Sequence, residues 1–136
     1  MAPKRKTILV IDDEASVRKV INKILVNRGY GVLEAENYDE AAAMMKDGLH
    51  RIDMLLIDVS LPGTNGFILA KALREIDPNL KVVFMSAPVG AEWLRYHGVP
   101  LTDEHFLPKP FGAAELLERV KYVLAWTAPL SARGAL

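Results

Sequence analysis

Short apolar runs alternate with helical patterns along most of this 136-residue chain, and this alternation constrains its fold more than any other feature. Between Val17 and Leu25, for example, apolar residues recur at the spacing of a helix that buries one stripe. Apolar runs separated by helices are typical of parallel strands in a sheet that is buried on both faces. The predicted strands are Ile8–Ile11, Val32–Ala35, Met54–Ile57, Val82–Met85 and Phe106–Leu107. The sequence therefore predicts an α/β fold, a doubly wound sheet of five parallel strands with five helices.

The fourth of the five predicted helices has the weakest pattern. Only Ala91–His97 has helical character in this part of the chain, and glycine and proline residues lie close on both sides of it. We therefore expect this helix to be short or irregular. The remaining helices are predicted around Val17 to Leu25 and at about Tyr38–Lys46, Phe67–Ile76 and Ala113–Leu124.

The chain is expected to form one domain at residues 7–125, a length that fits the usual size of a single domain. Residues 1–6 are predicted to be a basic N-terminal tail, and residues 126–136 a C-terminal tail. We expect no output domain after residue 125.

Composition excludes several classes of function. Lysine and arginine number 17, as do aspartate and glutamate, so the net charge is zero. A protein that binds nucleic acid by charge alone is therefore not expected. The chain has no cysteine, which excludes disulfides, thiolate zinc sites and cysteine nucleophiles. No apolar run approaches the roughly 18 residues of a membrane span, so we expect a soluble cytoplasmic protein with neither nucleic acid nor membrane among its partners.

Polar side chains follow four of the predicted strands, at the point where each strand ends. The pair Asp12 and Asp13 follows the first strand, Asp58 the third, Ser86 the fourth and Lys109 the fifth. Because ligands bind beyond the carboxyl ends of parallel strands, these side chains are expected to share one cleft. Clustered carboxylates repel one another, so the lysine and a divalent cation such as Mg²⁺ are expected among them. Alone, each aspartate also fits a turn or helix cap, Ser86 fits a cap, and a single lysine indicates nothing. Their joint occurrence favours the site.

Four segments of the chain resemble the signature segments of response-regulator receiver domains. They are Ile8–Glu14, Leu56–Gly63, Ser86-Ala87 and Lys109–Phe111. The resemblance spans roughly Thr7–Leu124, nearly the whole chain. It implies a flavodoxin-like fold, with residues 7–125 as the receiver domain.

The resemblance also implies a phosphorylation site that contains magnesium. Asp58 matches the phosphoacceptor, and Asp12 and Asp13 match the acidic pair that holds Mg²⁺. Within this pair Asp13 would bind the metal directly, and Asp12 mostly through water. Asp58 itself and the backbone carbonyl of Ser60 would complete the protein ligands.

Two further positions match residues that hold the phosphoryl group, and a third matches a switch residue. Ser86 and Lys109 correspond to the hydroxyl and the ammonium that bind the phosphoryl oxygens. Phe106 falls at the position of the switch aromatic, which the family couples to the hydroxyl of Ser86. A plain core residue on the last strand remains the alternative interpretation of Phe106.

The implied function is that of a receiver in two-component or phosphorelay signalling. Such a receiver is not an enzyme; it catalyses only its own phosphorylation and autodephosphorylation. Its partners would be a histidine kinase or a histidine phosphotransfer protein, and an unknown downstream protein. One alternative is a degenerate receiver that binds partners without being phosphorylated. Another is a haloacid-dehalogenase-like phosphatase, but that family needs a second aspartate two positions after the nucleophile, and Ser60 stands there.

Overall fold

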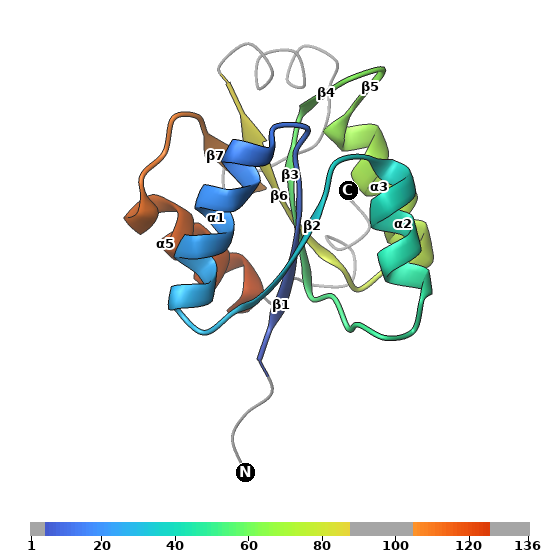
Figure 1. Ribbon diagram of the computed structural model, residues 1–136, viewed down its shortest axis with the longest axis horizontal. Coiled ribbons are helices and arrows are strands. Elements are labelled where there is room, and N and C mark those ends of the chain that lie inside the picture. The colour runs from blue at the N-terminus through green and yellow to red at the C-terminus, as the bar shows by residue number, and fades with distance from the viewer. Residues whose placement is uncertain (1–4, 88–104, 126–136) are drawn as a thin grey trace.

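The computed structural model describes residues 5–87 and 105–125. Its main sheet contains the strands β1 (Thr7–Ile11), β2 (Gly31–Ala35), β3 (Met54–Asp58), β6 (Lys81–Ser86) and β7 (Phe106–Pro108). The strands lie in the order β2-β1-β3-β6-β7, and every neighbouring pair is parallel (Figure 1). The predicted parallel sheet of five strands is therefore confirmed.

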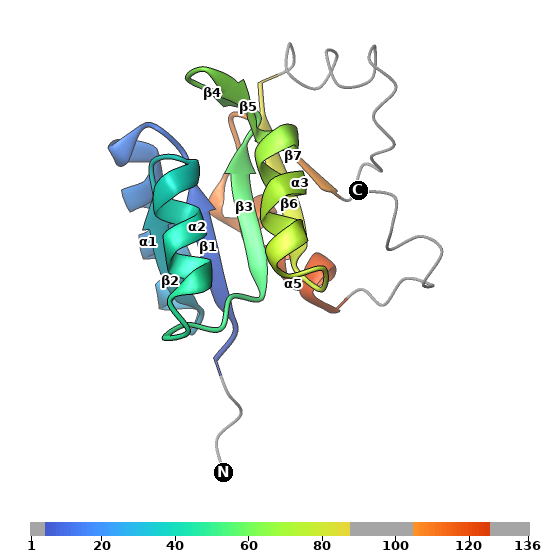
Figure 2. The same ribbon diagram turned by 90° about the vertical axis from the view of Figure 1, so that its right-hand side faces the viewer.

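Helices cover both faces of this sheet. The helices α1 (Ala15–Asn27) and α5 (Ala113–Ala125) lie on one face, and α2 (Tyr38–Lys46) and α3 (Gly66–Ile76) lie on the other (Figure 2). This doubly wound arrangement agrees with the fold predicted from the sequence. The predicted fourth helix at Ala91–His97 and the C-terminal tail at 126–136 lie outside the described residues. Within the described ranges, no helix is both long and apolar enough to cross a membrane.

The core consists of two apolar layers, one on each face of the sheet. Alternate residues of β1 point to opposite layers, because successive side chains of a strand face opposite sides. Ile8 and Val10 pack with α1 and α5, whereas Leu9 and Ile11 pack with α2 and α3. The central strand β3 is buried at every position, and Asp58 is its last residue.

A small antiparallel hairpin directly follows β3. The turn residues after Leu61 indicate a loop, but the structure pairs β4 (Ser60–Leu61) with β5 (Thr64–Asn65). Gly63 has a φ of 75° in the connecting turn, a conformation that favours glycine. The Asn65 side chain then accepts a hydrogen bond from the Ile68 N–H at 2.9 Å and so caps α3. The hairpin thus fixes the chain immediately beyond Asp58.

Candidate functional site

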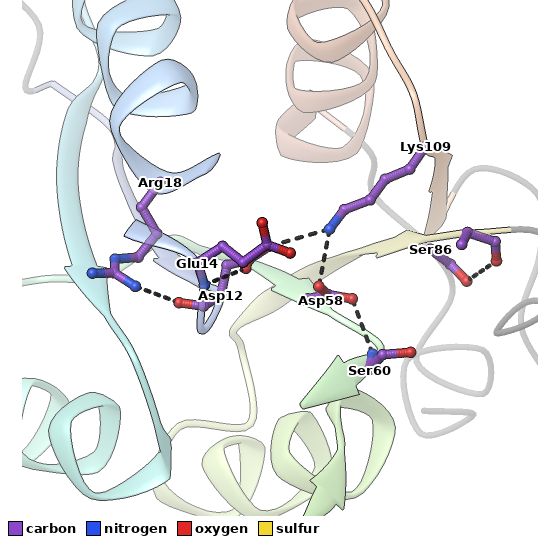
Figure 3. A network of polar contacts seen from close by, with 8 residues as sticks. Asp12, Glu14, Arg18, Asp58, Ser60, Ser86 and Lys109 are labelled. Atoms are coloured by element: carbon purple, nitrogen blue, oxygen red, sulfur yellow. Dashed lines mark hydrogen bonds and ion pairs between the residues drawn. The ribbon is translucent and has the colours of Figure 1, made fainter. Parts of the chain in front are cut away.

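The carboxyl ends of β1 and β3 bring three carboxylates together. Asp12 and Asp13 follow β1, and Asp58 ends the neighbouring strand β3. One oxygen from each of the three lies within 4.8 Å of the other two. The ammonium of Lys109, which follows β7, reaches into the same cluster (Figure 3). The structure thus brings together four of the residues that the sequence places at strand ends.

Asp12 is fully buried, and each of its polar atoms has a partner. Its Oδ1 accepts a hydrogen bond from the Glu14 N–H at 2.9 Å, and its Oδ2 lies 3.3 Å from the Lys109 Nζ. Burial raises the pKa of Asp12 above its ordinary value, and the charge of Asp58 adds to this rise. The Glu14 N–H and Lys109 act in the opposite direction. The Glu14 N–H and the Lys109 ammonium therefore stabilise the charged form of Asp12 against the effect of burial.

Asp58 is held at both carboxylate oxygens. Its Oδ1 accepts a hydrogen bond from the Ser60 N–H at 2.9 Å, and its Oδ2 accepts one from the Lys109 Nζ, also at 2.9 Å. The residue is 7% exposed. Asp58 therefore presents a fixed carboxylate near the surface, without a freely rotating side chain.

Lys109 supplies the positive charge of the cluster. Burial lowers the pKa of its ammonium, but the hydrogen bond and charge of Asp58, with those of Asp12, outweigh this effect and raise the pKa above its usual value. The main-chain N–H of Lys109 donates to the Ser86 carbonyl at 2.8 Å, which ties this segment to β6. One ammonium faces three carboxylates, so the cluster can hold a divalent cation through Asp12, Asp13 and Asp58.

Ser86 and Phe106 lie on the neighbouring strands β6 and β7. Ser86 is buried at the end of β6, and its hydroxyl donates to the Ala87 carbonyl at 2.7 Å (Figure 3). Phe106 is buried in the core, and its ring centroid lies 6.1 Å from that of Phe84. The expected roles of the two residues in phosphoryl binding and switching stay predictions, because the hydroxyl here is engaged with its neighbour.

The sequence did not indicate two residues that support the site from behind. Gly66 opens α3 so close to β3 that a Cβ atom there would lie 2.2 Å from the Asp58 carbonyl oxygen. Its N–H donates to the Val59 carbonyl at 2.7 Å. Arg18 of α1 donates from its Nη1 to the Asp12 carbonyl at 2.6 Å. The turn-rich segment before α3 was a signal for Gly66, but no pattern in the sequence marks Arg18.

Comparisons with known proteins agree with this geometry. The family model of the response regulator receiver domain matches residues 8–121. The chain is 38% identical over 126 residues to the phosphate regulon transcriptional regulatory protein PhoB of Pseudomonas aeruginosa, a match that covers 91% of this chain and 54% of PhoB. It is 34% identical over 117 residues to the transcriptional regulatory protein ResD of Bacillus subtilis, covering 86% and 47% of the two chains. The chain thus spans about half the length of these curated relatives.

Solved structures show the same relationship. A response regulator receiver protein from Sinorhizobium medicae is similar with a TM-score of 0.74 and 34% identity, over 89% of this chain and 95% of that chain. The receiver domain of the hybrid histidine kinase CckA has a TM-score of 0.69 and 34% identity, over 87% and 98% of the two chains. The predicted flavodoxin-like receiver fold is confirmed. Since the family match covers most of the chain, and the acidic pocket fits a phosphoacceptor site, this protein belongs to the family of response regulator receiver domains.

Proposed function

We propose that this receiver takes a phosphoryl group from the phosphohistidine of a histidine kinase or a histidine phosphotransfer protein, and that Asp58 accepts it. The observation that carries the proposal is the fixed carboxylate of Asp58, held between the Lys109 ammonium and the Ser60 N–H beside Asp12 and Asp13. Phosphoryl transfer needs an acceptor in line with the leaving group and positive charge near the equatorial oxygens. The Asp58 carboxylate would be the acceptor, and the Lys109 ammonium places positive charge beside it.

In the proposed transfer, the N–P bond of the phosphohistidine breaks and a bond forms between phosphorus and the Oδ2 atom of Asp58. The imidazole nitrogen keeps the electron pair, and the ring leaves as neutral imidazole because its other nitrogen carries a proton. We assign Oδ2 as the attacking oxygen because the Ser60 N–H holds Oδ1. Lys109 then exchanges its contact with Oδ2 for one with a phosphoryl oxygen, so it neutralises charge on the transferred group.

The residues around the cluster fit Mg²⁺, because they offer only oxygen ligands and because the exposed Asp13 leaves room for water. We propose that Asp13, Asp58 and the Ser60 carbonyl hold the ion directly, and that Asp12 holds it through water. When bound, the ion supplies positive charge to the phosphoryl oxygens. Water that attacks the phosphorus in the same pocket breaks the bond to Asp58 and releases inorganic phosphate. The protein therefore catalyses its own dephosphorylation, and we propose no other enzymatic activity for it.

Intact-mass spectrometry after incubation with acetyl phosphate and Mg²⁺ tests the proposed function. The expected result is one added phosphoryl group, which decays after the donor is removed. A degenerate receiver would gain no mass. A phosphatase of the haloacid-dehalogenase kind would turn over a small phosphomonoester, and this chain is expected to leave such a substrate intact.

Mg²⁺ is expected to raise the melting temperature of the protein, because a cation relieves the repulsion among the three carboxylates. A concentration ten times the Kd gives about 1.4 kcal/mol of stabilisation. This corresponds to roughly 4 °C for a domain of this size. Asp13→Ala is expected to lose the response, measured by thermal denaturation with and without Mg²⁺.

Glu14→Ala is the matched control for this experiment, because Glu14 is also exposed but only its main-chain N–H contacts the site. This variant is expected to keep the response to Mg²⁺. A response that survives in Asp13→Ala would contradict the assignment of Asp13 as a direct ligand.

We further propose that Ser86 and Phe106 carry the signal away from Asp58. In the phosphorylated state the Ser86 hydroxyl would leave the Ala87 carbonyl and bind a phosphoryl oxygen. The Phe106 ring lies in a tilted contact with that of Phe84, which stands two residues before Ser86 on β6. These two aromatic residues are also paired in the β6–β7 register. A shift of Ser86 can therefore reach Phe106 through one strand. Such a step is a population shift between two packings of the same fold.

Ser86→Ala is expected to disconnect the site from β7 and α5. In amide NMR spectra with beryllofluoride as the phosphoryl mimic, the wild-type protein is expected to show shifts from Asp58 through Ser86 to Phe106 and α5. The variant keeps the shifts near Asp58 and loses the distant ones. Ser60→Ala, which retains the backbone N–H and carbonyl of Ser60, is the control and keeps them all. If the distant shifts persist in Ser86→Ala, Phe106 is a core residue only.

The relatives suggest where such a receiver acts. PhoB and ResD are transcriptional regulatory proteins about twice as long as the matched region. We propose that the receiver itself signals through protein contacts, and its net charge of zero supports a role without direct nucleic-acid binding.

A further inference from the structure

Arg18 connects the acidic site to a second polar network that the proposed chemistry does not use. Its guanidinium donates from Nη1 to the Asp12 carbonyl at 2.6 Å (Figure 3). It also donates from Nε to the Glu34 carboxylate at 3.3 Å. The Arg18 side chain is 15% exposed and that of Glu34 is 18% exposed. The guanidinium is therefore fixed between α1, β2 and the segment that follows β1.

Glu34 holds the guanidinium in place because it has partners of its own. Asn22, one turn after Arg18 on α1, donates to the second oxygen of Glu34 at 2.9 Å. Lys19 also lies 3.6 Å from that oxygen, but its side chain is 75% exposed. Glu34 lies on β2 opposite Val10, so the whole network is built on the edge of the sheet next to the site.

The contact with the Asp12 carbonyl determines the orientation of a particular peptide group. That carbonyl belongs to the planar peptide that joins Asp12 to Asp13. On the other side of Asp12, its N–H donates to the Ala35 carbonyl at 3.2 Å. Asp12 is thus held to β2 at one peptide and to Arg18 at the next. The direction in which the chain enters Asp13 depends on this second contact.

We propose that Arg18 is a positioning residue for the cation site: by fixing the peptide between Asp12 and Asp13, it sets the affinity of the site for Mg²⁺. This inference rests on the proposed function. Residues that orient metal ligands from behind typically account for about 10- to 100-fold in metal affinity. Arg18 is expected to contribute about tenfold.

The sign of the effect separates positioning from simple electrostatics. Suppose that Arg18 acted only through its charge. Its removal would then take a positive charge away from the cation site and leave Glu34 without that neutralising charge, and both changes would strengthen Mg²⁺ binding. Loss of a positioning contact weakens binding instead. The two explanations therefore predict opposite changes in affinity.

The test is a Mg²⁺ titration of Arg18→Met. The Kd is measured from the amide NMR shift at Asp13 and, independently, by calorimetry. Methionine keeps the apolar stem of the side chain and removes the guanidinium. The expected result is about tenfold weaker Mg²⁺ binding.

Lys19→Met is the matched control, since it removes a positive charge beside Glu34 but no contact with Asp12. It is expected to bind Mg²⁺ with unchanged or slightly higher affinity. Arg18→Lys keeps the charge, but a single ammonium cannot reproduce the two-sided contact of the guanidinium. This variant is expected to bind Mg²⁺ more weakly than the wild type, and it serves as the test if Arg18→Met is too unstable to titrate.

The outcomes separate this inference from the proposed function. If the wild type binds Mg²⁺ and is labelled, but both Arg18 variants keep the wild-type affinity or exceed it, the positioning role is overturned and the proposed function stands. If the wild type neither binds Mg²⁺ nor gains a phosphoryl group, the proposed function fails and the inference fails with it.

Discussion

Asp58→Asn is expected to abolish labelling by acetyl phosphate completely, while the protein keeps its fold. Asparagine has the same shape as aspartate, and its amide oxygen can still accept the hydrogen bond from the Ser60 N–H that Asp58 accepts at 2.9 Å. The amide is not the negatively charged nucleophile that attack on phosphorus requires. Intact mass measured before and after incubation, together with a thermal melt of each protein, checks both halves of this expectation.

Asp53→Asn is the matched control, because Asp53 lies just before the same strand, at the opposite end of the sheet. Its carboxylate accepts a hydrogen bond from the Thr7 N–H at 2.9 Å, a contact that asparagine can also make. This variant is expected to gain one phosphoryl group at the wild-type rate. Labelling of Asp58→Asn at that rate would overturn the assignment of the phosphoacceptor.

Gly66→Ala is expected to damage both stability and labelling, although the substitution adds a single methyl group. The new Cβ would lie 2.2 Å from the carbonyl oxygen of Asp58 and 3.1 Å from the Cα of Val59. Both are backbone atoms, so no side-chain rotation relieves the clash. Overpacking of this kind costs roughly 3 kcal/mol, which corresponds to a fall of about 10 °C in melting temperature. Circular dichroism measures the fall, and intact mass measures the loss of labelling.

Gly112→Ala provides the comparison, since Gly112 follows the site residue Lys109 by three positions in the sequence. A Cβ there would meet only the Glu115 carboxylate, at 3.9 Å, which is ordinary contact. This variant is expected to melt and to be labelled like the wild type. Equal behaviour of the two alanine variants would show that Gly66 has no role in holding the Asp58 segment.

The sequence predicts the sheet and the placement of the acidic residues because both depend on local patterns. The run Met54–Ile57 is apolar at every position, which indicates a strand buried on both faces. Asp58 follows at the carboxyl end of this strand, where polar residues of a parallel sheet are expected. The structure extends this strand by one residue, to include Asp58 itself. Strand direction then brings Asp12 and Asp58 to one edge without further information.

The supporting contacts could not be predicted, because they depend on distances between elements and leave no periodic signal. Arg18 occupies a position on α1 that an exposed helical arginine would also occupy, and nothing in the sequence pairs it with the Asp12 carbonyl. The β4–β5 hairpin is too short to show alternation, so its turn residues indicate only a loop. The orientation of the Ser86 hydroxyl toward Ala87 is a choice between rotamers, which a sequence does not record.

The ammonium of Lys109 comes late in the chain, and this order matters for how the domain matures. Lys109 is 97 positions from Asp12 and 51 positions from Asp58. Contacts across such separations form only after the intervening loops have closed, so they are among the slow steps of folding. A nascent chain that has emerged only as far as β6 would carry all three clustered carboxylates without their shared counter-charge. If Lys109 has the role proposed for it, phosphotransfer is expected to begin only when β7 has docked, and labelling of the chain would then report that the sheet has folded.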